Sequence, residues 1–254
     1  MSRRKVSCYN THIMIKPQIT QLNRYEVLRY LGLHSNSPVL SGNGADDMRL
    51  QEQIARCERT VLETARIRCV YQILPLRRIA FDSTPDTENR QDIAILFHGK
   101  DIARLLDGCS EVVLMALTLG AELERVLMRL EVTDMSDALV LDICASVGVE
   151  AAADDFEKQL SAELLADGKY LTNRFSPGYG DLPLSHQRPV LELLNASRAA
   201  GITLTPSQLM VPRKSVTAIL GICDHMKEKT LGGCSLCPLK TKCSYRSHNL
   251  RCYE

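Results

Sequence analysis

The sequence predicts an α+β fold, in which helices pack on a sheet of short strands. The middle third of the chain mixes strand-like apolar runs (VYQIL, IAILF and EVVLMALTL) with helical patterns that begin near Asp101 and Ala121. With 254 residues the chain is long enough to bury a full core. One junction, VVLMALTLGAELE, resembles the first turn of a doubly wound sheet, but it carries a single glycine, Gly120, where that fold uses a glycine-rich loop. A doubly wound sheet is therefore disfavoured.

Helical periodicity predicts three of the helices on this sheet. NRYEVLRYLG is expected to form a short helix with Asn23 as its N-cap and Gly32 as its stop. A longer helix is expected from Asp47 to Arg68, and another over most of residues 135 to 167. The first half of that last helix is rich in small residues, so another element can approach its backbone closely. Its charged residues predict a solvated face rather than a catalytic pair: Glu150, Asp154, Asp155, Glu157 and Lys158.

The last third of the regular structure is expected to contain one helix and two short strands. SHQRPVLELLNASRAAG predicts a helix that begins near Ser185, which places His186 at an exposed helix start. QLMV and SVTAILGI then predict two strands separated by Pro212. Arg213 and Lys214 are expected to be solvated residues in the connection between these strands.

Charge and hydropathy limit the classes of partner. The formal net charge is +1, from 31 basic and 30 acidic side chains, so no basic stripe for nucleic acid and no polybasic patch for membranes is expected. The first residues, MSRRKVSCYNTH, lack the apolar stretch of a signal peptide, which predicts a cytoplasmic protein. No uncharged apolar run reaches the roughly 18 to 20 residues that a membrane span needs.

The composition changes abruptly at Cys223. The segment CDHMKEKTLGGCSLCPLKTKCSYRSHNLRCYE has few aliphatic residues but five of the ten cysteines, so it needs a staple other than a hydrophobic core. This predicts two parts, a main domain over residues 1–222 and a cysteine-rich tail over residues 223–254. The tail spacing is C-x10-C-x2-C-x5-C, and its candidate ligands for a metal or cluster are Cys223, Cys234, Cys237 and Cys243.

The sequence leaves three alternatives for the chemical state of the tail cysteines. A single C-x2-C pair with Pro238 directly after Cys237 favours a 4Fe-4S cluster, because structural zinc sites more often use two such pairs. The spacing of the last three ligands also resembles the iron-sulfur loop of the endonuclease III family of DNA glycosylases, in ligand pattern only. Zinc is the second state, and free thiols or a disulfide are the third. Cys252 is a substitute ligand. The remaining cysteines are expected to pack as small hydrophobes: Cys8, Cys57, Cys69, Cys109 and Cys144.

The segment RFSPGYGD, residues 174–181, has the composition of a ligand-binding loop. Gly178 and Gly180 bracket Tyr179, so the backbone can take positive φ and come close to a ligand. Pro177 stiffens the entry, Arg174 offers a forked cationic donor, and Tyr179 offers an aromatic face and a hydroxyl. These groups suit a small zwitterionic or anionic molecule with a flat ring. The alternative is an ordinary β-turn with a surface arginine.

RFSPGYGD, together with LPLSHQRPVLELLNA and GITLTPSQLMVPRKSVTAILGI, resembles the activation (reactivation) domain of cobalamin-dependent methionine synthase. The signature of that family for S-adenosylmethionine (AdoMet) is Arg, three residues, then Gly-Tyr-Pro. Arg174, Gly178 and Tyr179 match it, whereas Gly180 replaces its proline. The likeness covers about residues 110 to 222, and NRYEVLRYLG resembles the start of the stand-alone proteins of this group. No corrinoid-binding or homocysteine-binding module precedes it in the sequence.

The resemblance implies a bent, mainly antiparallel sheet surrounded by helices. It also implies an accessory subunit that binds AdoMet and supports reductive methylation of the cobalamin of a separately encoded methionine synthase. Arg174 would hold the AdoMet carboxylate, the backbone from Pro177 to Gly180 would approach the ligand, and Tyr179 would line the pocket. No catalytic acid–base residue is required, because the reacting atoms belong to AdoMet and cobalt.

Two other functions fit the same sequence. The tail would make the protein an iron-sulfur redox activator of another corrinoid methyltransferase, with a flavodoxin or ferredoxin as the electron donor. Alternatively, zinc would staple the tail of a non-enzymatic interaction module.

Overall fold

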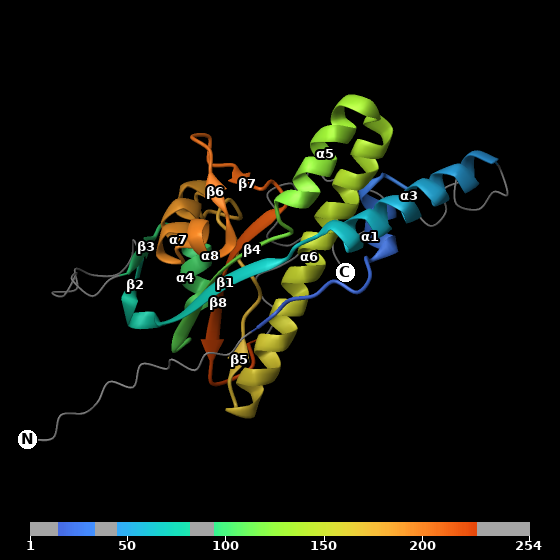
Figure 1. Ribbon diagram of the computed structural model, residues 1–254. Coiled ribbons are helices and arrows are strands. Elements are labelled where there is room, and N and C mark those ends of the chain that lie inside the picture. Colours follow the sequence, from blue (N-terminus) through green and yellow to red (C-terminus); the bar gives the residue numbers. More distant parts are fainter. Residues whose placement is uncertain (1–14, 34–44, 82–93, 228–254) are drawn as a thin grey trace, which may run out of the picture.

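The computed structural model describes residues 15–33, 45–81 and 94–227 (Figure 1). Its α-helices are α1 (Arg24–Tyr30), α3 (Ala45–Thr64), α4 (Lys100–Leu106), α5 (Ala121–Thr133), α6 (Met135–Ala166), α7 (Gln187–Leu193) and α8 (Ala196–Ala200). Its strands are β1 (Arg68–Pro75), β2 (Ile79–Phe81), β3 (Ile95–Phe97), β4 (Glu111–Thr118), β5 (Tyr170–Leu171), β6 (Thr203–Leu204), β7 (Met210–Val211) and β8 (Ser215–Cys223).

The main sheet is antiparallel throughout the described residues, in the strand order β1-β4-β8-β5. In the central strand β4, Met115 lies opposite Tyr71 of β1 on one side and Ala218 of β8 on the other. Two small sheets, β2-β3 and β6-β7, accompany it. The predicted α+β class with an antiparallel sheet is confirmed, and the doubly wound alternative is excluded because β4 has antiparallel neighbours on both sides.

Helices cover both faces of this sheet. Val113 and Leu117 of β4 contribute to a core with α3, α5 and α6, whereas Val112 and Leu114 face the opposite way, toward α4, α7 and α8. In Figure 1, α6 crosses one face with α5 and α3 beside it, and α4, α7 and α8 lie on the other. Because successive side chains of a strand point to opposite faces, a strand that is covered on both faces is apolar at every position. This explains the continuous apolar run of β4.

The long helix α6 packs closely against α3, as its small residues predict. A Cβ added at Gly148 would lie 3.1 Å from the side chain of Val61 on α3. Further along α6, Phe156 is fully buried and meets the ring of Tyr71 edge to face, with 5.2 Å between the ring centroids. The second half of α6 therefore anchors the helix on the sheet.

Several boundaries differ from the sequence prediction. The second helix ends at Thr64 rather than Arg68, because the chain enters the sheet here and the N–H of Arg66 donates to the carbonyl of Leu119. The helix expected from Ser185 is divided into a 3-10 turn, α7 and α8, with a left-handed residue, Asn195 (φ 48°), at the break. Asparagine tolerates this conformation better than most residues.

The connection before β8 also differs. β7 pairs with β6 rather than with β8, and both residues expected to be solvated form ion pairs. Arg213 binds Glu124 of α5 at 2.5 Å, and Lys214 binds Asp142 of α6 at 2.7 Å. The connection is thus held against the α5–α6 hairpin.

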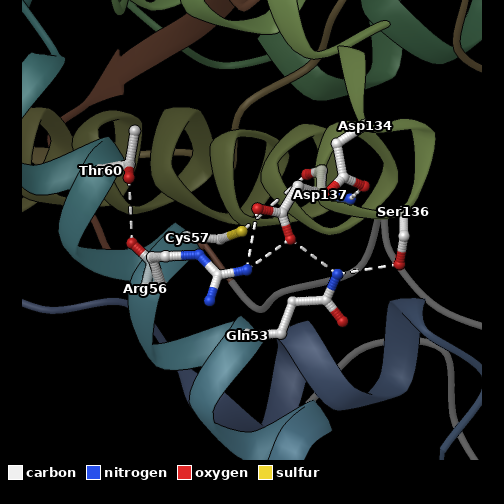
Figure 2. A network of polar contacts seen from close by, with 7 residues as sticks. All are labelled: Gln53, Arg56, Cys57, Thr60, Asp134, Ser136 and Asp137. Carbon is white, nitrogen blue, oxygen red and sulfur yellow. Dashed lines mark hydrogen bonds and ion pairs between the residues drawn. The ribbon is translucent and has the colours of Figure 1, made fainter.

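A polar network joins α3 to the start of α6 (Figure 2). Arg56 donates to both carboxylate oxygens of Asp137, at 2.7 and 2.8 Å, and the amide of Gln53 donates to Asp137 at 2.8 Å. The carboxylate of Asp134 caps the helix by accepting from the N–H of Asp137 at 3.0 Å. Burial raises the pKa of Asp137, but the hydrogen bonds from Arg56 and Gln53 outweigh it and hold that pKa below its ordinary value.

Asp137→Asn is expected to lower the free energy of unfolding by about 1 kcal/mol at pH 7, since Arg56 is half exposed and solvent screens the pair. The folded-state pKa of Asp137 is depressed, so this stabilisation is present above the unfolded pKa of about 3.9 and is lost as the pH falls below it. Urea denaturation of both proteins at several pH values measures the effect. The difference should shrink in acid, whereas a difference that stays constant would contradict the role of the charge. Asp167→Asn, at an exposed position after α6, is the control.

Candidate functional site

The segment RFSPGYGD runs along the edge of the main sheet and then turns outward. Phe175 exchanges two backbone hydrogen bonds with Ile219 of β8, at 2.9 and 2.8 Å, so the segment continues the edge that β5 begins. The chain then turns through Gly178 (φ 95°) and Gly180 (φ 52°), both in the left-handed region that favours glycine. The two glycines thus provide the turn for which their positions suggested them.

Arg174 lies between this edge and α6. Its guanidinium is within 3.1 Å of Glu150, 2.8 Å of Asp154 and 2.7 Å of Glu157, and its side chain is 18% exposed. The three acids are spaced four and three residues apart, which puts them on one face of α6. Burial lowers the pKa of Arg174, but Glu157, Asp154 and Glu150 outweigh it and raise that pKa. Three acids on the helix face that the sequence predicts to be solvated therefore neutralise the charge of Arg174.

This arrangement has the charges that an α-amino acid group needs. One guanidinium sits beside Glu150 and Asp154, whose side chains are 51% and 71% exposed. A guanidinium binds carboxylates strongly, and carboxylates bind ammonium groups. A zwitterionic head group could therefore place its carboxylate on Arg174 and its ammonium on the exposed acids.

Two tyrosines lie beside these charges. Tyr179 is 66% exposed at the turn, and Tyr30, at the end of α1, is 49% exposed. Burial, Glu150 and Tyr30 raise the pKa of Tyr179, while Arg174 opposes them, so the four side chains share one region. Tyr30 was not expected here, because only the packing of α1 against α6 brings it close. Its sequence neighbourhood indicates a helix and nothing more.

His186 is buried, which corrects the expectation that it faces solvent. Its side chain accepts a hydrogen bond at Nε2 from the backbone N–H of His98, at 3.1 Å, and its ring packs edge to face on Phe97. In the turn Leu184–His186, Leu184 and Ser185 are exposed, whereas the ring of His186 is buried because it packs against Phe97 of β3 and His98. His186 is therefore an internal contact between these segments.

Of the four predicted cluster ligands, Cys223 alone falls in the described residues; Cys234, Cys237, Cys243 and the substitute Cys252 lie outside them. Cys223 is buried at the end of β8, next to the thiol of Cys109. Burial and the hydrogen bond with Cys223 raise the pKa of Cys109 to about 12. Across residues 15–33, 45–81 and 94–227, no group of three or more metal-ligating side chains is found.

The other described cysteines pack as the sequence predicts. Cys57 and Cys144 are buried in the core around α6, and Cys69 lies partly buried on β1. Burial raises the pKa of the Cys57 thiol to about 11 and those of Cys69 and Cys144 to about 12. These thiols are protonated at neutral pH and chemically inert.

A surface depression of about 590 Å³ lies elsewhere on the molecule. It is lined by Pro17–Ile19, by Leu62 near the end of α3 and by Ala65–Arg68. Among the described residues that line it, none is expected to bind a ligand or metal. Among the helices that the structure describes, none combines the length and the apolar character that a membrane crossing requires.

The antiparallel sheet, its covering helices and the Arg174–Tyr179 edge loop define an α+β domain with a charged loop at the edge of its sheet. The structure titled "Crystal Structure of the MetH Reactivation Domain bound to AdoHcy" has this fold, with a TM-score of 0.57 and 17% sequence identity over 82% of this chain and 75% of that one. Residues 112–234 match the family described as "Vitamin B12 dependent methionine synthase, activation domain". The sequence matches none of the curated proteins compared with it.

Proposed function

We propose that the protein binds AdoMet at the surface formed by Arg174, Glu150, Tyr179 and Tyr30, and thereby supports reactivation of a cobalamin-dependent methionine synthase. One observation carries this proposal. On a reactivation-type fold, the Arg-x3-Gly-Tyr loop brings a guanidinium, exposed carboxylates and an aromatic ring together at the sheet edge. That a structure with the same fold is bound to AdoHcy, the demethylated product of AdoMet, supports it.

The roles of the residues follow from their chemistry. Arg174 would hold the carboxylate of AdoMet, and Glu150 or Asp154 its ammonium group. Gly178 and Gly180 carry no Cβ and adopt positive φ, so the backbone from Pro177 to Gly180 could approach the ligand closely. Tyr179 offers a face for the flat adenine ring. When bound, AdoMet supplies the methyl group, and an external reductant supplies the electron.

The proposed reaction needs no acid or base from the chain. AdoMet would supply the methyl group from its sulfonium, which would leave as a neutral thioether, so no proton transfer by the chain would be needed. The protein therefore contributes binding and orientation. A corrinoid-binding methionine synthase lacking its own activation domain, encoded separately, is the proposed partner, with a flavodoxin or ferredoxin as the proposed electron donor.

Calorimetric titration with AdoHcy, AdoMet, adenosine and methionine tests the binding proposal. AdoHcy and AdoMet should bind at one site, and the two fragments should bind far more weakly because each uses only part of the surface. If neither AdoMet nor AdoHcy binds, the proposed function is wrong. Restored methionine formation by a synthase fragment that lacks an activation domain, on adding this protein and reduced flavodoxin, tests the partner.

The cysteine spacing of the tail favours an additional redox role. We propose that residues 223–254 hold a 4Fe-4S cluster through Cys223, Cys234, Cys237 and Cys243, with zinc as the alternative metal. The C-x10-C-x2-C-x5-C spacing supports this, and Cys223 is the last residue of β8, directly before the rest of the tail. Iron and sulfide analysis of anaerobically purified protein tests it. A colourless protein with stoichiometric zinc would decide for a structural staple.

A further inference from the structure

The loop that carries Tyr179 is tied to the start of α4, which lies about 80 residues earlier in the chain. The N–H of Lys100 donates to Oδ2 of Asp181 at 2.7 Å, and the N–H of Asp101 donates to Oδ1 of the same carboxylate at 3.1 Å. One carboxylate thus satisfies two of the N–H groups that a helix start leaves without a partner within the helix.

Two glycines make this contact possible, and they do so reciprocally. A Cβ added at Gly99 would lie 2.8 Å from Oδ1 of Asp181, and one added at Gly180 would lie 2.5 Å from Oδ2 of Asp101. Both distances are shorter than real carbon–oxygen contacts. Each aspartate therefore occupies the space that the glycine of the other segment leaves open.

The same geometry explains why Gly180 stands where the family signature has proline. Gly180 has φ 52°, whereas a proline ring fixes φ near −65°. The positive φ favours glycine here, and the missing Cβ leaves room for the carboxylate of Asp101. The departure from the signature thus accompanies the contact between this loop and the start of α4.

Backbone hydrogen bonds connect the segment around Asp181 to the residues of the proposed ligand surface. The N–H of Leu182 donates to the carbonyl of Tyr179 at 3.0 Å, and the N–H of Gly178 donates to the carbonyl of Leu182 at 2.9 Å. Asp181 lies between the partners of these bonds. A movement of Asp181 would therefore move Gly178 and Tyr179 as well.

The charges around Asp181 keep its carboxylate ionised. Burial raises its pKa, but the N–H groups of Lys100 and Asp101 outweigh this, and its own N–H and Arg104 lower the pKa further. Arg104 also lies 3.7 Å from the carboxylate of Asp101, so it faces both acids.

We propose that Asp181 is a positioning residue for the ligand loop: with Asp101, Gly99 and Gly180 it forms a clasp that holds Gly178 and Tyr179 in their binding conformation. This inference rests on the proposed function, since it concerns the same surface. It assigns to Asp181 no contact with the ligand. The clasp acts by reducing the conformational freedom that binding would otherwise remove.

The test compares Asp181→Ala and Asp181→Asn with wild type in two measurements, AdoHcy affinity and amide hydrogen exchange of residues 176–182 without ligand. Asp181→Ala should lower the affinity about tenfold and speed exchange in the loop by a similar factor. The reason is that the two carboxylate oxygens that accept from the N–H groups of Lys100 and Asp101 are lost, so the loop is no longer tied to α4. Asp181→Asn should be intermediate, since the single amide oxygen has fewer lone pairs for the two donors. Asp167→Ala, at an exposed position, should leave both measurements unchanged.

The outcomes separate the two proposals. If wild type binds AdoHcy and Asp181→Ala binds it equally well, the positioning role is overturned. If wild type does not bind, the proposed function fails, and amide hydrogen exchange of the loop alone then tests the clasp. Equal exchange rates in wild type and Asp181→Ala would overturn it. Should the alanine variant fail to fold, the asparagine variant carries both measurements.

A double-mutant cycle tests the reciprocal contact directly. Gly180→Ala should be more destabilising in wild type than when combined with Asp101→Ala, which removes the carboxylate that the new Cβ would meet. The strain of alanine at positive φ is present in both backgrounds and cancels. Additive effects of the two substitutions would contradict the clasp.

Discussion

Arg174→Ala is expected to weaken AdoHcy binding about 10- to 100-fold, the range that corresponds to the loss of one charge-assisted hydrogen-bond partner. In the structure the guanidinium is largely buried against α6, so it is held in place before a ligand arrives. A preorganised donor loses little side-chain entropy on binding. Calorimetric titration of wild type and variant measures the difference.

The acids around Arg174 should increase this loss. Without the guanidinium, Glu150, Asp154 and Glu157 would present three uncompensated carboxylates to the carboxylate of the ligand. Arg174→Lys should therefore retain part of the affinity, because it keeps the positive charge but loses the fork. Equal affinities for wild type and Arg174→Ala would remove Arg174 from the site.

Arg213 provides a matched control. It too is paired with acids, Glu124 at 2.5 Å and Glu131 at 2.8 Å, but it lies in the connection before β8, against the α5 side of the molecule. Arg213→Ala should leave AdoHcy affinity unchanged. A similar loss in both variants would mean that net charge, and not the position of Arg174, governs binding.

Phe156→Ala is expected to lower the free energy of unfolding by about 3 to 5 kcal/mol, the usual cost of removing a fully buried aromatic side chain. Phe156 holds α6 on the sheet through its edge-to-face contact with Tyr71. A cavity would remain, since the neighbouring strand and helix cannot collapse into the space. For a chain of this size the midpoint of thermal unfolding should fall by about 6 to 20 °C.

Leu165→Ala, on the same helix, is the comparison for this second experiment. Leu165 is 58% exposed, so its removal should change stability by no more than about 0.5 kcal/mol. Urea denaturation with a common slope for all variants measures both effects. If Phe156→Ala cost no more than Leu165→Ala, the packing of α6 on β1 would be wrong.

Signals that lie within a few residues of each other predicted much of the fold correctly. Asn23 accepts hydrogen bonds from Tyr25 and Glu26 as the N-cap of α1, and Gly32 ends the helix with positive φ, because both signals act over one turn. The run EVVLMALT indicated a strand, and the helices that cover both faces of the sheet explain why residues 112 to 117 are all apolar. The division of the helix after Ser185 was not predicted, since apolar periodicity continues across Asn195 while the backbone does not.

The sequence by itself determined the central strand, the first helix with its caps and the Arg-x3-Gly-Tyr loop, because these depend on residues close together in the chain. Tertiary structure alone decided what this loop touches. Arg174 meets acids 24 and 20 residues earlier, and Asp181 meets the start of α4, 81 and 80 residues earlier. No local pattern encodes such pairs, since they depend on how α6 and α4 pack against the sheet. Gly180 shows the difference most clearly: in the sequence it is a departure from a signature, and in the fold it is the space that Asp101 requires.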